Sequence, residues 1–168
     1  TPMRYQLTRA NRRPALMMLA LLLVAPPVLA QDTIARRVEV SGTAELTLAN
    51  VAGDITIAGV DGDAIVIEAT KRGDTQEARD QVEVEISERG DRVEVRTRYP
   101  RNRRDGGRVE VAFSVQVPSG AEVSATSVSG NVTVEEVDGE TRAESVSGDV
   151  RITAAAELTR AKSVSGDI

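Results

Sequence analysis

The chain has 168 residues, of which 40% are hydrophobic and only 2% aromatic, and its formal net charge is −5. This composition fits one folded domain, or one domain and part of another, and it excludes a disordered chain. The chain contains no cysteine and no histidine. Disulfides, Ser-His-Asp and Cys-His nucleophilic sites and ordinary zinc sites are therefore excluded.

Residues 3–30 have the pattern of an export signal. Four arginines precede an apolar run over 15–25, and Val28-Leu29-Ala30 provides small residues for cleavage before Gln31. The run is shorter than the roughly 20 residues of a membrane span, and no later segment is apolar enough for one. We therefore expect export to the periplasm, the cell surface or the medium, with no transmembrane segment in the mature chain. Arg12-Arg13 leaves a twin-arginine route as the alternative to ordinary secretion.

The chain after residue 30 is acidic. Four of the 21 basic residues and none of the 26 acidic ones precede residue 31, so the remaining chain carries a net charge of −9. A surface of this kind disfavours nucleic acid and anionic lipid as the main partner. We expect no binding to nucleic acid.

Short runs of alternating apolar and polar residues predict strands between residues 38 and 69. These runs are Val38–Val40, Leu46–Leu48, Ile55–Ile57 and Ile65–Ile67. Asp74 to Glu77 then has the pattern of a capping box, which predicts a short helix that ends before Val82. We expect it to be the only helix of the mature protein.

Three longer alternating runs follow, over 82–86, 93–98 and 109–117. The first two are joined by Glu88–Asp91, a connection with the length and the glycine of a hairpin turn. The second connection, 100–107, contains the strongest cluster of positive charge: Arg101, Arg103 and Arg104. A solvated loop is the simplest interpretation. A partner-binding loop for an anionic envelope polymer, lipid headgroups or an acidic protein is the alternative.

An internal repeat occupies the C-terminal part of the sequence. Ser-Val-Ser-Gly followed by Asp or Asn begins at Ser127, Ser145 and Ser163, an interval of 18 residues, and further Val-x-Gly steps mark nine-residue units. Such regularity predicts stacked structural units. We therefore expect an all-β fold in which residues 31–117 form strands and hairpins with one short helix. Residues 118–168 then form a β-solenoid of 18-residue coils, each with two strand-turn units, and the stop within a repeat suggests C-terminal truncation.

Aligning the repeats assigns side chains to the interior, because strand residues alternate between faces and equivalent residues stack between coils. The predicted inward columns are small and aliphatic: Val123/Thr141/Thr159, Ala125/Ala143/Ala161, Val128/Val146/Val164, Val132/Val150/Ile168, Val134/Ile152 and Val137/Ala155. On the outside, Glu144 is expected to stack on Lys162, which would contribute a few tenths of a kcal/mol.

Each unit ends in a glycine suited to a tight corner with positive φ. We interpret these as structural turn residues: Gly130, Gly139, Gly148 and Gly166. A polar residue follows three of them, so Asn131, Asp149 and Asp167 are expected to stack at adjacent corners. Ca²⁺ would relieve the repulsion there. The glycine pattern differs from that of calcium β-rolls, however, so a solvated acidic edge without a cofactor is the first interpretation and a calcium corner the alternative.

Two Arg-Gly-Asp tripeptides, Arg72–Asp74 and Arg89–Asp91, invite comparison with integrin-binding motifs. Gly-Asp is also ordinary turn and helix-cap chemistry. We therefore interpret both tripeptides as structural.

Several motifs together resemble the bacterial putative-adhesin family, domain-of-unknown-function family 4097. They are the export signal, the Val-x-Gly-Asp-Ile-x-Ile unit at Val51–Ile57, the Val-Pro-Ser-Gly step within Val115–Gly120 and the repeats over Ser127–Ile168. The resemblance implies an exported all-β solenoid with no established catalytic residues.

We accordingly expect a non-enzymatic adhesin or scaffold that binds a protein or polysaccharide of the cell envelope. Two alternatives remain. One is a polysaccharide-active β-helix enzyme that uses paired carboxylates, and the other is a calcium-stabilised surface repeat protein.

Overall fold

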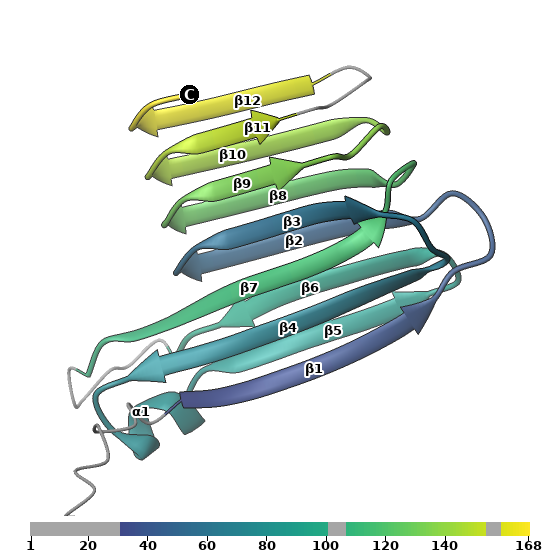
Figure 1. Cartoon of the computed structure of the whole chain (residues 1–168). Coiled ribbons are helices and arrows are strands. Elements are labelled where there is room, and N and C mark those ends of the chain that lie inside the picture. Colours follow the sequence, from purple (N-terminus) through teal and green to yellow (C-terminus); the bar gives the residue numbers. More distant parts are fainter. Residues whose placement is uncertain (1–30, 101–106, 154–158) are drawn as a thin grey trace, which may run out of the picture.

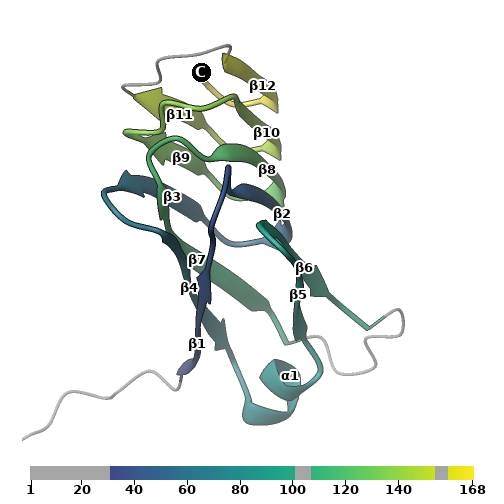
Figure 2. The same cartoon turned by 90° about the vertical axis from the view of Figure 1, so that its right-hand side faces the viewer.

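The computed structural model describes residues 31–100, 107–153 and 159–168. Within these ranges, two mixed six-stranded sheets face each other and one short helix lies at one end (Figures 1 and 2). The prediction of a mostly β chain with one short helix is confirmed for this part of the chain. The predicted export signal lies outside the described residues.

The strands of each sheet are given in spatial order. Sheet A contains β1 (Gln31–Glu39), β4 (Ala64–Gly73), β7 (Val109–Pro118), β3 (Ile55–Val60), β9 (Val132–Glu135) and β11 (Val150–Thr153). Sheet B contains β12 (Thr159–Ser165), β10 (Thr141–Ser147), β8 (Glu122–Ser129), β2 (Glu45–Ala52), β6 (Arg92–Arg98) and β5 (Glu83–Arg89).

From β8 onward, successive strands alternate between the two sheets, and each pairs in parallel with the strand two elements later. The register equals the sequence repeat: Thr141 lies between Val123 and Thr159. β2 and β3 extend the same stack, since β2 pairs with β8 and β3 with β9. Both sheets thus contain strands from either side of residue 118, and the domain division expected there stays a prediction.

Antiparallel pairing is confined to the opposite end of the sandwich. β4 pairs with β1 and β7, and β5 with β6. The β5–β6 connection is the predicted hairpin, in which Gly90 has φ +63° between the paired residues Arg89 and Arg92. This geometry suits glycine at a tight turn.

The helix α1 (Gln76–Asp80) forms where the capping pattern predicts it. The N-cap is Thr75, whose hydroxyl accepts a hydrogen bond from the Ala78 backbone N–H at 3.1 Å. Asp74 instead accepts from the backbone N–H of Arg108. The buried Arg79 connects the helix to β1 through a 3.1 Å ion pair between its Nε and Asp32 Oδ2.

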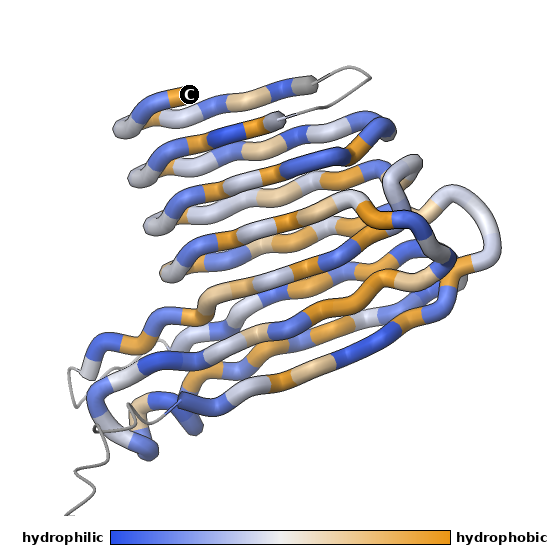
Figure 3. Tube along the Cα trace, viewed as in Figure 1, coloured by the Kyte–Doolittle hydropathy of each residue, from blue (hydrophilic) through white to orange (hydrophobic). Residues whose placement is uncertain are grey.

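The core lies between the sheets and is almost wholly aliphatic. Along the strands, apolar and polar residues alternate, as Figure 3 shows by colour. Fully buried side chains include Leu46, Leu48, Ile55, Ile57, Ile65, Ile67, Val93, Val95 and Val115. At roughly 1.5–3 kcal/mol for each side chain removed from water, these columns are the main stabilising term of the fold.

Most predicted inward columns have buried members. Buried residues from them are Val123, Thr141, Ala125, Ala143, Val132, Val150, Val134 and Val137. On β11 and β12, Ile152 and Ala161 are half-buried, and Ile168 is 74% exposed beyond the end of β12. Ala155 lies outside the described residues.

The prediction that Val128, Val146 and Val164 point inward is wrong. Their exposed fractions are 48%, 47% and 69%. β8 continues to Ser129, so strict alternation from Ala125 places Ser127 inside and Val128 outside.

Candidate binding face on sheet B

The outer face of sheet B is made by alternate residues of six strands. Because the strands pair in a regular register, equivalent side chains form rows that cross them. Two rows are distinctive, one of valines near the glycine corners and one of glutamates at the other end of the strands. The residues between them on β2 and β8 are small and uncharged: Thr47, Ala49, Ser124 and Thr126.

The valine row consists of Val51, Val128, Val146 and Val164 on β2, β8, β10 and β12. The register places them side by side, because their chain neighbours pair across adjacent strands. All four are among the exposed large hydrophobic residues, and Val51 is 41% exposed. Single exposed apolar residues are common, whereas a contiguous apolar row is a feature of interaction sites.

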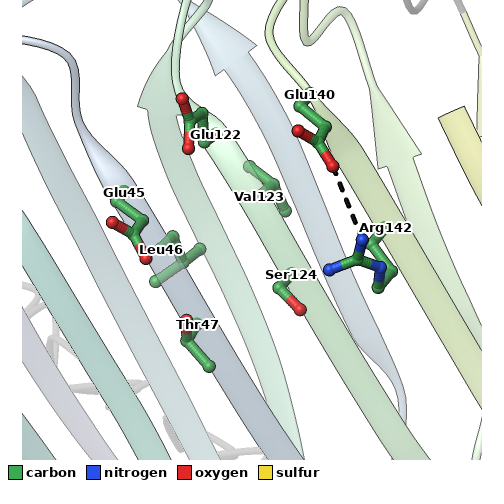
Figure 4. A pocket seen from close by; sticks show the side chains of 8 residues that line it. All are labelled: Glu45, Leu46, Thr47, Glu122, Val123, Ser124, Glu140 and Arg142. Atoms are coloured by element: carbon green, nitrogen blue, oxygen red, sulfur yellow. Dashed lines mark ion pairs between the residues drawn. The ribbon is translucent and has the colours of Figure 1, made fainter. Parts of the chain in front are cut away.

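The glutamate row consists of Glu45, Glu122 and Glu140. Glu45 pairs in register with Glu122, and Glu140 accepts the Val123 backbone N–H with its own carbonyl oxygen, which places it beside Glu122. Together with Thr47, Ser124 and Arg142 they line a shallow depression of about 180 Å³ (Figure 4).

Two of the three glutamates have cationic partners. Glu45 Oε2 lies 2.6 Å from Arg92 Nη2, and Glu140 Oε1 lies 3.5 Å from Arg142 Nη2, the pair marked in Figure 4. Within the described part of the chain, Glu122 forms no ion pair. Glu122, in the middle of the row, is therefore the carboxylate of the depression that is available to a cationic group of a partner.

The three residues of the predicted calcium corner do stack, on the edge beside the glycine turns. The side-chain oxygen of each accepts a backbone N–H from the next: Asp149 N–H donates to Asn131 Oδ1 and Asp167 N–H to Asp149 Oδ1, both at 2.9 Å. Asp54, which the sequence reasoning did not include, accepts from Asn131 N–H at 2.8 Å. In the described residues, no group of three or more acidic side chains is placed to hold a metal ion. The side chains of Asp54, Asn131 and Asp149 form a ladder of hydrogen bonds to the backbone along this edge.

The four turn glycines differ in what requires them. Gly130, Gly148 and Gly166 have φ of +148°, +150° and +154°. Gly139, between β9 and β10, has no such angle, but a Cβ there would lie 2.3 Å from the Ala121 carbonyl oxygen. The first three thus serve both a backbone conformation and a close approach to the preceding corner, and Gly139 a close approach alone.

The other predicted residues fall into two groups. Arg101, Arg103 and Arg104 lie outside the described residues. Of the Arg-Gly-Asp tripeptides, Asp91 accepts the backbone N–H of Ser41 at 2.7 Å, and Asp74 accepts that of Arg108 at 3.1 Å. Both aspartates therefore have a structural hydrogen bond.

The glutamate row and the outward valines were missed by the sequence reasoning. Counting alternate positions from Ala125 through the end of its strand would have placed Val128 outside. A shared position in the sequence could have grouped the glutamates, because each lies six residues before a valine of the valine row.

Among the described residues, no helix has the length and apolarity needed to cross a membrane. No family model matches the chain, and no curated protein matches its sequence. Membership of family 4097 stays a prediction.

The chain is similar in structure to bacterial proteins described as adhesins. One is a putative cell adhesion protein from Clostridium sporogenes, with 8% identity, TM-score 0.46 and coverage of 83% of this chain and 98% of that one. Another is a putative adhesin from Parabacteroides distasonis, with 17% identity, TM-score 0.40 and coverage of 70% of this chain and 47% of that one. A third is a putative adhesin from Bacteroides fragilis, with 9% identity, TM-score 0.42 and coverage of 83% of this chain and 62% of that one. The chain thus spans less than two thirds of the latter two structures.

Proposed function

We propose that the chain is an exported, non-enzymatic β-solenoid protein of the cell envelope that binds other proteins through the outer face of sheet B. In this proposal the 18-residue coils act as a rigid scaffold that holds the rows of the face in register. The observation that carries the proposal is the valine row, in which four β-branched side chains on adjacent strands remain exposed.

A protein surface fits this face better than a polysaccharide. Sugar rings are commonly held by stacking on aromatic side chains, and the outward residues of β2, β8, β10 and β12 include none. The depression of about 180 Å³ is also smaller than the pockets of roughly 300–1,000 Å³ that enclose small ligands. A flat row of valines with charged neighbours suits a flat protein surface.

The experiment is a pull-down from envelope extract with the tagged full chain as bait. Val146→Lys places a charge in the middle of the valine row, and Thr133→Lys places the same side chain on the outer face of sheet A as the matched control. We expect a specific envelope protein to be retained by the wild type and by Thr133→Lys and lost with Val146→Lys. Equal retention by all three would rule out this face.

A further variant addresses the arginine loop. With Arg101, Arg103 and Arg104 all changed to alanine, the proposal expects retention to be unchanged. Loss of the partner in this variant, with retention in Val146→Lys, would move the binding site from sheet B to the loop.

A further inference from the structure

The outer face of sheet B can be divided into two halves that carry opposite charges at several matching positions. The line between β2 and β8 leaves three strands on each side. At this line both strands carry small uncharged side chains in register, with Thr47 beside Ser124 and Ala49 beside Thr126. The centre of the face is therefore flat and uncharged.

The next strands outward, β6 and β10, carry opposite charges at matching positions. On β6, three successive outward residues lie in register with Glu45, Thr47 and Ala49: Arg92, Glu94 and Arg96. On β10, the outward residues that lie beside Glu122, Ser124 and Thr126 are Glu140, Arg142 and Glu144. Read in the same direction, β6 is positive, negative, positive, and β10 is negative, positive, negative.

The outermost strands continue this order. Glu85 of β5 pairs in register with Arg96, and Lys162 of β12 pairs with Glu144. The outermost residues at this register are again opposite in sign. At these registers on β6, β10, β5 and β12, the charges of one half of the face are thus opposite to those of the other.

We propose that two copies of the chain pack face to face through the outer face of sheet B, about a two-fold axis parallel to the strands and between β2 and β8. Such a rotation keeps the position along the strand and exchanges the two halves. It therefore sets β2 opposite β8, β6 opposite β10 and β5 opposite β12 of the second copy. The contact is isologous, with the same patch used by both copies.

Across this contact, four charged residues of one half meet residues of opposite charge in the other half. Arg96 faces Glu144 of the second copy, Glu94 faces Arg142, Arg92 faces Glu140 and Glu85 faces Lys162, and each contact occurs twice. In the valine row, Val51 faces Val128. Val146 and Val164 face Arg98 and Glu83, which pair in register with each other on β6 and β5. One contact joins like charges, Glu45 opposite Glu122, where Arg92, already 2.6 Å from Glu45, lies alongside to offset the repulsion.

The face is large enough for a specific contact. Six strands at about 4.8 Å spacing and seven residues at about 3.3 Å rise give an area of about 24 by 20 Å between the outermost Cα positions. With the margins of the side chains this is about 600 Å² for each copy, or about 1,200 Å² in total, at the lower end of specific interfaces. Small central residues also allow two sheets to approach to about 10 Å.

A second copy fits this face better than a partner of one charge sign. An acidic protein would meet Arg92 and Arg96 favourably on one half but Glu140 and Glu144 unfavourably on the other, and a basic protein would have the reverse problem. This inference rests on the proposed function, because it names a partner for the same binding face.

The test is a charge swap between two single variants of the full chain. Within one chain Arg96 and Glu144 are three strands apart, about 14 Å, so neither can directly rescue the other. Arg96→Glu sets glutamate against Glu144 of the second copy, and Glu144→Arg sets arginine against Arg96. We expect each variant alone to dimerise at least tenfold more weakly than the wild type, because like charges then face each other twice.

An equimolar mixture of the two variants should restore the dimer, since every swapped position then faces its opposite. Sedimentation velocity at up to about 0.1 mM protein, where a micromolar contact is saturated, measures each state. Glu135→Arg, on the outer face of sheet A, is the control for the change of charge, and melting curves check that all variants fold.

A wild type that is monomeric throughout this range overturns the proposal. So do a dimer that both single variants leave intact and a mixture that stays monomeric. Failure here is separable from failure of the proposed function. A monomer that still captures an envelope protein refutes self-association alone, and a dimer that captures nothing refutes the envelope partner alone.

Discussion

At the scale of single residues, a column of polar side chains inside the sandwich shows one unmet hydrogen bond. Asn50, Ser127, Ser145 and Ser163 are in register on adjacent strands. Ser145 Oγ donates to the Gly130 carbonyl at 3.0 Å and Ser163 Oγ to that of Gly148 at 2.9 Å. For Ser127 the equivalent acceptor is Gly53, which already accepts from Asn50 Nδ2 at 3.0 Å. Ser127 Oγ is buried without a partner among the described residues.

The two serines should therefore respond oppositely to removal of the hydroxyl. Ser145→Ala loses a satisfied hydrogen bond, and we expect it to lower the free energy of unfolding by about 1 kcal/mol. Ser127→Ala removes an unsatisfied buried group and should be neutral or stabilising by up to about 1 kcal/mol. Denaturant unfolding of both variants measures the difference. An equal loss in the two would show that Ser127 has a partner, such as a buried water.

At the scale of elements, the corners between strands of opposite sheets depend on close stacking of glycines. Gly148 follows β10 with φ +150°, and a Cβ there would lie 2.4 Å from the Gly130 carbonyl oxygen. Both the backbone conformation and the approach exclude a larger residue. The same contact recurs from Gly130 to Gly53 and from Gly166 to Gly148, so each corner is fitted to the one before it.

Gly148→Ala should accordingly destabilise the protein by about 2 kcal/mol or more, through strain at positive φ and displacement of the next corner. Gly120→Ala is the matched control, because a Cβ at Gly120 meets nothing within 4 Å, and it should change stability by less than about 0.5 kcal/mol. Thermal or denaturant unfolding compares them. A Gly148→Ala variant as stable as Gly120→Ala would contradict the steric account.

Local patterns in the sequence predicted the strands, the hairpin at Gly90 and the helix after Thr75, because each depends on side chains within a few residues. The pairing of β2 with β8 and of β3 with β9 was not predicted. The unit at Val51–Ile57 resembles the later repeats, but a shared motif does not show how the chain between the two copies folds. The binding face was missed because its rows depend on that long-range register. The assignment of Val128 to the interior also broke the alternation of its own strand.

At the scale of the whole molecule, burial falls along the stack. Ile57 and Val134 are fully buried, whereas Ile152, next in the same column, is half-buried. On sheet B, Ala125 and Ala143 are fully buried and Ala161 is half-buried. Each strand is stabilised chiefly by its neighbours, so local stability should fall in the same direction.

Hydrogen exchange should reveal this gradient. We expect the amides of β2, β3 and β8 to exchange most slowly and those of β11 and β12 to exchange fastest among the strands, because fewer buried contacts must be broken to open them. Mass spectrometry of exchanging peptides measures the order. Uniform protection across both sheets would mean that the stack opens as a single cooperative unit.

The ladder of side-chain acceptors at the corners carries a consequence for the order of assembly. The hydrogen bonds that Asp149 N–H donates to Asn131 and Asp167 N–H donates to Asp149 each span 18 residues, but the one that Asn131 N–H donates to Asp54 spans 77. The bonds are chemically alike, yet closing the longer loop costs about 1.3 kcal/mol more in chain entropy. A full-length chain that refolds should therefore form the rungs at Asn131 and Asp149 first and the rung at Asp54 last, because β4 to β7 lie within the longer loop.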